Sequence, residues 1–551
     1  MKKILCIMLV MAMAFSLPSC RKINEQSSYI STENSEISWG TVEIIEDDDK
    51  EDDDKEDDDK NSSTSQQDNS NTQNNSLSEN SSSNYNNDAS TTESQDTSKP
   101  YKGNLPTLSA GKLPQFANRQ FEISGFWAPY EISEESFNVY KNAGFTTLAM
   151  INHSLAKTSQ DQFYLSSERT MKALEICKKV GLKAILNYND WIATWSENDL
   201  EYYSKTPFSQ FDLYGDYKDI ITGVHICDEP YKNKHFPLYG DKTLIDDFKK
   251  VYPNAKFIVN LIPYTAYASR DFSSYDEMME LYEKTFMQPF EKPFVSVDVY
   301  PFHEGSIQDD GTMALNYEYI ANSAKKYGVK PGYILQSSVG GADTGKKEFE
   351  MELSEGDLRW EINSALAFGA DTLQYYCYSV PYSLNSKNEK DYMYDYCILN
   401  RDNTPSPTYY HLQKLHKELK NISNVILAYD WDESIGILGT EDCVGRVAAL
   451  VYDEDFNLKN FKDPKHFVSV TSTQEALVSR FTNKEYGEGY MLVNFADRIG
   501  NTVTAKFRDC KSVAIYDAAK GSTPQIVKID KNGQFTLELE YGEGVFIIPL
   551  K

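Results

Sequence analysis

The sequence predicts an α/β protein: a (β/α)8 TIM barrel followed by a C-terminal all-β sandwich. Two observations predict this order. From residue 121 to about residue 425, short apolar runs alternate with longer amphipathic stretches, and eight such alternations are the count of a (β/α)8 barrel. From about residue 430 the pattern consists only of short apolar runs and turns, which is typical of a sandwich.

Eight strands are predicted for the barrel, at 122–128, 146–152, 183–189, 220–228, 256–263, 294–301, 332–338 and 371–378. Helical patterns lie between and after them, at 133–143, 168–180, 244–252, 274–286, 316–327, 358–368 and 409–419. Gly144, Gly181 and Gly369 follow three of these helices and are predicted to be left-handed caps. A doubly wound sheet is the competing fold, but no glycine-rich phosphate loop follows the first strand.

The chain divides by composition into four predicted parts. Residues 1–20 form a signal segment, because Lys2 and Lys3 precede an apolar run too short to span a membrane comfortably. Residues 21–105 contain three EDDDK repeats and a polar run, and are predicted to be a disordered linker. The barrel is assigned to residues 106–425 and the sandwich to residues 426–551.

The predicted signal segment ends in Leu17-Pro18-Ser19-Cys20, which resembles a bacterial lipoprotein signal. That resemblance implies a lipid on Cys20 and attachment to the outer face of a bacterial membrane, at the cell surface. A plain secretory signal is the alternative. The net charge is −28, and more than half of it lies in residues 21–100. This acidity argues against nucleic acid as a partner.

The sandwich is predicted to contain strands at 446–452, 476–482, 490–495, 502–507, 512–517, 525–528, 534–539 and 544–549. Apart from Cys6 and Cys20 in the signal segment, the cysteines are scattered among apolar neighbours: Cys177, Cys227, Cys377, Cys397, Cys443 and Cys510. We interpret them as buried free thiols. No spacing of cysteines or histidines indicates a metal site, and no cofactor is expected.

The fourth predicted strand ends in two adjacent carboxylates, Asp228 and Glu229, followed by Pro230. Charges are costly to bury, so both side chains are expected at the rim where the strand emerges. Other predicted strands also end in amides, carboxylates or aromatic residues: Trp127, Asn152, His153, Asn187, Asn189, Trp191, Asn260, Asp298, Tyr300, Gln336, Gln374, Tyr376 and Tyr378. Amides suit sugar hydroxyls, rings suit sugar faces and carboxylates suit acid–base work, so a carbohydrate substrate is predicted.

Three short motifs carry a resemblance to a known family over about residues 120–420. They are Asp228-Glu229-Pro230, Asp298-Val299-Tyr300-Pro301, and Arg359-Trp360 with Ala365 to Ala370. Together they resemble the barrel glycoside hydrolases of the large retaining clan, near its β-galactosidase-like families. The resemblance implies that Glu229 is the general acid/base and that Tyr300 helps to position the nucleophile.

Two positions depart from that clan. Gln336 stands where the nucleophilic glutamate is expected, and Asp228 stands where asparagine is common. The adjacent Asp-Glu pair resembles that of hexosaminidases that use substrate assistance. In those enzymes the substrate's 2-acetamido oxygen is the nucleophile, so the resemblance implies that Asp228 stabilises it while Glu229 protonates the leaving oxygen.

Other readings of the sequence stay open. Asp298 is the second carboxylate of an inverting or unusual retaining glycosidase, or the register of strand seven differs and a loop carboxylate (Glu304, Glu352 or Glu355) reaches the site. A catalytically silent carbohydrate-binding lipoprotein would have Asp228 and Glu229 bound to structural groups. A scaffold or adhesion protein would have a flat surface.

Overall fold

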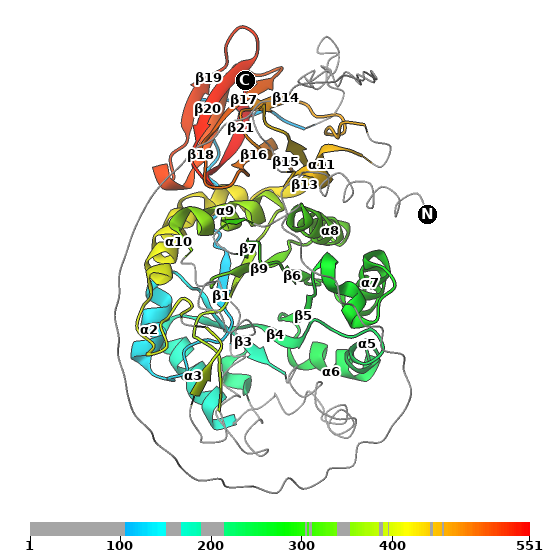
Figure 1. Ribbon diagram of the computed structural model, residues 1–551, viewed down its shortest axis with the longest axis vertical. Helices are drawn as coiled ribbons and strands as arrows, with labels where there is room; N and C mark the ends of the chain where they lie inside the picture. Colours follow the sequence, from blue (N-terminus) through cyan, green and yellow to red (C-terminus); the bar gives the residue numbers. More distant parts are fainter. Residues whose placement is uncertain are drawn as a thin grey trace, which may run out of the picture. The chain divides into compact units, whose positions relative to one another are not determined.

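The computed structural model of the protein describes residues 105–149, 167–188, 214–303, 306–307, 311–338, 353–384, 390–394, 396–440, 445–453 and 457–551. It confirms the predicted fold class, because a ring of parallel strands with helices outside it is followed by antiparallel sheets (Figure 1). Cys20 and the rest of the chain up to residue 104 lie outside the described residues.

The barrel is built from eight parallel strands in the order β1-β10-β9-β6-β5-β4-β3-β2. A hydrogen bond of 2.9 Å from the Thr146 backbone N–H to the Ile123 carbonyl links the two ends of this sheet. The strands agree with the predicted ones but are shorter at most ends: β1 Glu122–Gly125, β2 Thr147–Ala149, β3 Lys183–Asn187, β4 Ile221–Asp228, β5 Lys256–Leu261, β6 Ser296–Asp298, β9 Gly332–Gln336 and β10 Thr372–Tyr376.

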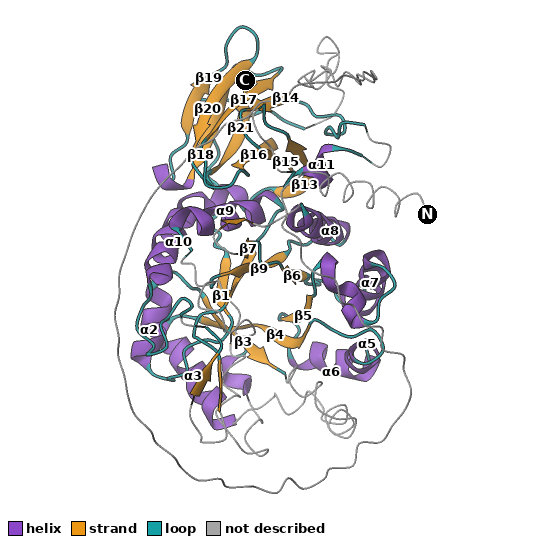
Figure 2. Ribbon diagram, viewed as in Figure 1, coloured by secondary structure: helices purple, strands orange, loops and turns teal. Residues whose placement is uncertain are grey.

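Helices surround this ring (Figure 2). They are α2 Glu134–Asn142, α3 Ser167–Val180, α5 His235–Tyr239, α6 Lys242–Val251, α7 Tyr275–Tyr282, α8 Thr312–Lys326, α9 Glu355–Ala367 and α10 Pro407–Ile426, with a 3-10 turn at Tyr264–Arg270 and a π-helical turn at Glu283–Met287. Short strand pairs occur at β7 Phe302–His303 with β8 Ser306–Ile307 and at β11 Tyr382–Leu384 with β12 Lys390–Tyr392. Side chains cap the first turns of several helices, namely Ser133, Asp241, Ser274 and Ser354.

The three glycines predicted as left-handed caps adopt that conformation. The φ angles of Gly144, Gly181 and Gly369 are +91°, +79° and +80°. Gly144 also meets a close neighbour, since a Cβ atom there would lie 2.5 Å from Cβ of His416 on α10. Both the backbone angle and the packing therefore require glycine at this turn.

The C-terminal part is a two-layer sandwich. One sheet has the order β13-β15-β16-β21-β18-β19 and the other β14-β17-β20. Phe467, Val503 and Phe507 of the smaller sheet share a buried core with Val478 and Ile547 of the larger one. The strands are β13 Asp430–Ile437, β14 Phe467–Ser472, β15 Ala476–Asn483, β16 Gly487–Asn494, β17 Asn501–Phe507, β18 Ser512–Asp517, β19 Gln525–Lys528, β20 Gln534–Leu539 and β21 Gly544–Leu550.

One predicted sandwich strand is wrong, and two strands were not predicted. Residues 446–452 contain the short helix α11, Ala448–Val451, instead of a strand. Val447, Leu450 and Val451 are buried, and their spacing of three and four positions suits one helix face. A short apolar run cannot be assigned by periodicity alone, which explains the error. The strands missed by the sequence analysis are β13 and β14.

Helix α9 joins the barrel to the sandwich. Asn363 on α9 donates to the Gly542 carbonyl at 2.8 Å, and the Tyr541 hydroxyl donates to Asp357 at 2.6 Å. The rings of Trp360 and Phe495 lie 4.7 Å apart. The apolar core is continuous between the two parts, because buried residues of both belong to one cluster.

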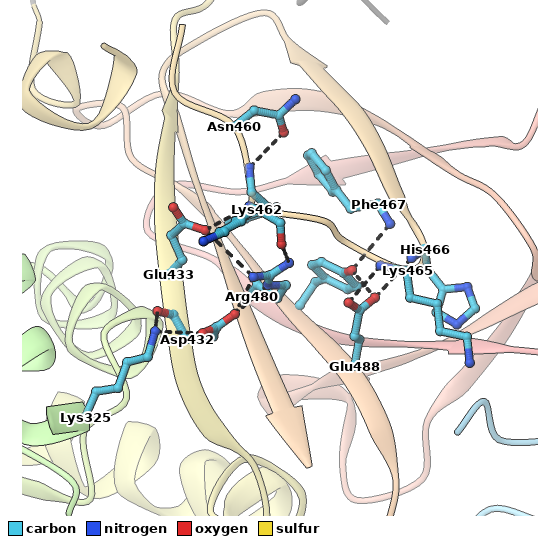
Figure 3. Close-up of polar contacts among 12 residues, drawn as sticks. Lys325, Asp432, Glu433, Asn460, Lys462, Lys465, His466, Phe467, Arg480 and Glu488 are labelled. Carbon is cyan, nitrogen blue, oxygen red and sulfur yellow. Dashed lines mark hydrogen bonds and ion pairs between the residues drawn. The ribbon is translucent and has the colours of Figure 1, made fainter. Parts of the chain in front are cut away.

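A second link runs through Arg480 on β15 (Figure 3). Its guanidinium donates to Asp432 on β13 at 2.7 Å and to the Lys462 carbonyl at 2.7 Å. Lys325 on α8 donates to the same Asp432 carboxylate at 2.7 Å. Burial opposes the charge of Asp432, but the contacts with Lys325 and Arg480 prevail and hold its pKa below the ordinary value.

Candidate active site

The side chains that face the barrel interior can be assigned on β5. Phe257 points outward, since its ring lies 5.0 Å from that of Phe248 on helix α6. Ile258 lies on the opposite face, in a small buried cluster with Ile185 of β3 and Phe294. Because side chains alternate along a strand, Asn260 faces the interior with Ile258, at the carboxyl end of β5.

Strand β4 contains a bulge that decides where its acidic end points. His225 pairs with Ile258, whereas Cys227 pairs with Val259 and Asp228 with Asn260, so the register shifts by one residue. Without this shift, alternation would place Asp228 on the face opposite to His225. The bulge therefore brings Asp228 onto the same interior face as Asn260.

Asn260 holds two carboxylates with one amide group. Its Nδ2 atom donates to Oδ1 of Asp228 at 3.1 Å and to Oδ1 of Asp298 at 2.7 Å. The Ser296 hydroxyl donates to its Oδ1 atom at 2.9 Å, which fixes the orientation of the amide. Asn260 is buried, whereas Asp228 is exposed at the strand end. The predicted residues Asp228, Asn260 and Asp298 thus come together.

Asp298 lies in an environment that disfavours its charge. Burial raises the pKa of this carboxyl well above the ordinary value, and the nearby Glu229 and Asp228 act in the same direction. The hydrogen bond from Asn260 opposes the shift but does not reverse it. These effects disfavour ionisation of Asp298, because two neighbouring carboxylates resist a third negative charge.

Glu229 follows Asp228 with φ of +45°, a left-handed conformation that is unusual for a glutamate. Its backbone N–H donates to the Asn260 carbonyl at 3.0 Å. Trp127, after β1, also has a positive φ of +56°. Strained backbone of this kind concentrates at functional sites, which makes both strand ends candidates for function.

Arg270, in the 3-10 turn that follows β5, contacts both the side chain and the backbone of Glu229. One guanidinium N–H forms an ion pair with the Glu229 carboxylate, and Nε donates to the Glu229 carbonyl at 3.1 Å. The guanidinium also stacks over the Tyr231 ring, 4.6 Å from its centroid. Arg270 is not among the site residues predicted from the sequence. The only available signal was its place on a loop after a barrel strand, where site residues gather.

The side chain of Gln336 forms hydrogen bonds with backbone groups. Its Nε2 donates to the carbonyls of Phe302 and Ser338, both at 3.0 Å, and its Oε1 accepts from the Phe302 N–H at 2.9 Å. The side chain therefore holds the segment that follows β6. Its predicted contact with substrate stays a prediction that these bonds do not support.

Glu361 of helix α9 is a second residue that the sequence analysis missed. It is fully buried and accepts the Gln336 backbone N–H at 2.8 Å. Burial raises the pKa of this carboxyl well above its ordinary value, while the Gln336 bond opposes the shift. Glu361 therefore fixes the carboxyl end of β9 from helix α9.

Aromatic side chains gather beside the acidic group. The Tyr300 and Tyr376 rings lie 5.7 Å apart, and both residues pack against a small apolar cluster that contains Trp127 and Ile334. Burial raises the pKa of Tyr300 well above its ordinary value, with Asp298 the largest of the nearby negative charges acting in the same direction. The predicted residues Trp127, Tyr300 and Tyr376 are thus neighbours.

The remaining predicted residues are placed as follows. Asn187 is buried at the end of β3, and Gln374 is buried on β10, where it donates to the Ser124 hydroxyl at 3.1 Å. Glu355 is engaged by Arg359 and Lys414 on the helices. Several predicted site residues lie outside the described residues, namely Asn152, His153, Asn189, Trp191, Glu304 and Glu352. Within the described part of the chain, no group of three or more His, Cys, Asp or Glu side chains could hold a metal ion.

No family model and no curated protein matches this chain. Solved structures with a similar fold include a family 39 glycoside hydrolase from the gut symbiont Bacteroides cellulosilyticus WH2, at 12% identity over 79% of this chain and 83% of that chain, with a TM-score of 0.43.

Two further solved structures are similar. One is a catalytic mutant of Gan42B, a GH42 β-galactosidase from G. stearothermophilus, at 10% identity over 79% of this chain and 99% of that chain (TM-score 0.47). The other is a family 5 glycoside hydrolase from Bacteroides vulgatus ATCC 8482, at 12% identity over 82% and 93% (TM-score 0.44). At these identities and scores the likeness concerns the fold and carries no activity with it.

Proposed function

We propose that this protein is a glycoside hydrolase that binds its carbohydrate at the carboxyl ends of the barrel strands. The observation that carries the proposal is the Asn260 amide, which ties Asp228 to Asp298 directly beside Glu229. Carboxylates in two different environments, next to Tyr300 and Tyr376, are what acid–base cleavage of a glycosidic bond requires.

In this proposal Glu229 is the general acid/base and protonates the leaving oxygen. Asp228 stabilises the substrate's 2-acetamido group, whose oxygen attacks the anomeric carbon, so the substrate is an N-acetylhexosaminide. Two observations support substrate assistance over a protein nucleophile. Gln336 cannot act as a carboxylate, and burial together with the neighbouring Glu229 and Asp228 raises the pKa of Asp298, which disfavours the ionised form that a nucleophile needs.

The test compares N-acetylhexosaminides with the matching plain hexosides, both with the same aryl leaving group. Only the acetamido substrates should be cleaved, because removal of the acetamido group removes the nucleophile. Asp228→Asn should lower kcat by roughly 10²–10³-fold, as for other lost transition-state partners. Asp219→Asn, which changes an exposed aspartate just before β4, at the opposite end of that strand from Asp228, is the matched control. Equal cleavage of both substrates, or labelling of Asp298 by a fluorinated sugar, would instead assign a two-carboxylate mechanism.

One observation favours a second candidate, a carbohydrate-binding protein without catalysis. The ion pair of Arg270 with Glu229 ties the expected acid to a structural group. Such a protein would bind oligosaccharides but release no reducing ends from them. Calorimetric binding without turnover, on the same set of acetamido and plain sugars, would support this candidate and reject the hydrolase.

We also propose that the protein is anchored to the bacterial cell surface through a lipid on Cys20. The support is the Leu17-Pro18-Ser19-Cys20 sequence and the polar stretch that follows it. None of the helices that the structure describes has the length and apolar character needed to cross a membrane. Cys20→Ala should move the protein from the membrane fraction to the medium, and unchanged retention would reject the anchor.

A further inference from the structure

Two buried thiols face each other beside the aromatic residues of the candidate site. The Sγ atoms of Cys377 and Cys397 lie 3.3 Å apart, and neither residue is exposed to solvent. Cys377 follows the last residue of β10, and Cys397 lies 20 positions further along the chain. Both are free cysteines in the structure, as the sequence analysis predicted.

The backbone around each thiol is fixed independently of the sulfur contact. The Ile398 N–H donates to the Cys377 carbonyl at 3.3 Å, and the Ser337 hydroxyl donates to the same carbonyl at 3.0 Å. The Ser406 hydroxyl donates to the Cys397 carbonyl at 2.7 Å. The two sulfurs are therefore presented to each other by a hydrogen-bonded frame.

We propose that Cys377 and Cys397 form a disulfide when the chain folds in an oxidising compartment. A disulfide has an S–S distance of about 2.05 Å, so the sulfurs need to approach by a little over 1 Å from their present separation. Other described cysteines are placed differently. Cys177 lies on helix α3, Cys227 lies on β4 with its Sγ atom 3.5 Å from Nδ1 of His235, and Cys510 lies between β17 and β18 of the sandwich.

The oxidant in this reaction is a second disulfide, such as oxidised glutathione or an oxidised dithiol protein. One thiolate attacks that disulfide and forms a mixed disulfide, which the other thiolate then displaces. The two protons lost by the cysteine thiols are taken up by the two leaving thiolates, so the oxidant gains two electrons and two protons and becomes two thiols. In the folded chain, burial raises the pKa of the Cys377 thiol well above its ordinary value, which slows attack by this thiol once it is fully buried.

This bond would connect the end of β10 to the segment that carries a second aromatic residue. The ring of Tyr394 meets Tyr376 edge-to-face at 6.4 Å, and both pack in the cluster that contains Cys377 and Cys397. The disulfide would hold Tyr394 beside Tyr376. This role does not depend on the proposed glycoside hydrolase activity.

The test is refolding of the denatured full chain in a mixture of oxidised and reduced glutathione, followed by alkylation in denaturant and peptide mapping. A peptide linking Cys377 to Cys397 is expected, with Cys177, Cys227 and Cys510 alkylated. Alkylation of both Cys377 and Cys397, or random pairing with the other cysteines, would overturn the proposal. The same mapping on protein exported to a bacterial periplasm covers the case in which refolding fails.

A stability measurement adds a matched control. Reductant should lower the Tm of the oxidised parent by a few degrees, since a closed loop of this length constrains the unfolded chain. The double variant Cys377→Ala/Cys397→Ala should show no response to reductant, and Cys177→Ala should respond as the parent does. An equal response of the double variant would overturn the proposal.

Discussion

The side-chain amide of Asn260 on β5 donates to Asp298 on β6 at 2.7 Å. On its other side β5 pairs with β4, the strand that ends at Asp228 and Glu229. The same nitrogen reaches Asp228, so a single residue sets the spacing of two acidic groups. Asp298 is a buried acid that accepts from a neutral donor, whereas Asp228 is an exposed acid at the end of β4. This division gives the two aspartates different chemistry, and the first prediction tests it.

Asp298→Asn should leave acetamido-substrate cleavage within about tenfold of the parent, because an amide resembles the neutral acid that its surroundings favour. Steady-state kcat and KM on an N-acetylhexosaminide measure this. A loss of several orders of magnitude would identify Asp298 as the nucleophile of a two-carboxylate enzyme.

The same variant has a predicted pH signature in stability. The pKa of Asp298 is raised in the folded state. The contribution of this group to the free energy of unfolding is therefore fully present below the ordinary aspartate pKa of about 3.9 and is lost as pH rises through the folded pKa. Asp298→Asn should therefore gain stability over the parent as pH increases from acid to neutral. Denaturant unfolding at several pH values checks this, and a constant difference would contradict it.

Glu229→Gln should abolish turnover of natural glycosides while sparing part of the activity on substrates with an activated aryl leaving group. Only the natural leaving group needs a proton from the acid. Parallel rates on a natural disaccharide and an activated aryl glycoside provide the measurement. Unchanged activity of the variant on the disaccharide would remove Glu229 from the mechanism.

Arg270→Met should separate the two candidate functions. If Glu229 is the acid, loss of the guanidinium should change kcat on a natural glycoside, since the group that holds the Glu229 carboxylate and carbonyl is removed. If the ion pair is only structural, the variant loses stability and gains no activity. Lys232→Met, which removes a neighbouring ion pair with Glu277, is the control and should leave kcat unchanged.

Arg480→Ala should destabilise the protein by on the order of 3 kcal/mol, because it leaves the Asp432 carboxylate without its buried partner. Lys325→Ala removes a half-exposed partner of the same carboxylate and should cost less than about 1 kcal/mol. The folded pKa of Asp432 is lowered, so this stabilisation is lost as pH falls through that pKa. Urea unfolding at neutral and acidic pH measures the difference in the free energy of unfolding between the parent and Arg480→Ala. This difference should become smaller in acid, and an unchanged difference would contradict the assignment.

Local sequence patterns predicted most of the fold because barrel strands and helices follow hydrophobic periodicity. The glycines at 144, 181 and 369 were identified for the same local reason, since each ends a helix. The error at residues 446–452 arose where an apolar run was too short to distinguish a helix from a strand. The strands β13 and β14 were missed because their patterns are partly polar, with charged residues such as Asp432 and Glu433 in β13.

By itself, the sequence determined the barrel, the sandwich and the set of polar residues at the strand ends, because each depends on neighbours a few positions away. Only the tertiary structure decided which of these residues meet. The bulge in β4 turns Asp228 onto the face of Asn260, and Arg270 reaches Glu229 from 41 positions away. The hydrogen bond between Gln336 on β9 and Phe302 on β7 also joins two strands. Contacts of this kind arise when distant segments pack, and no local pattern in the chain records them.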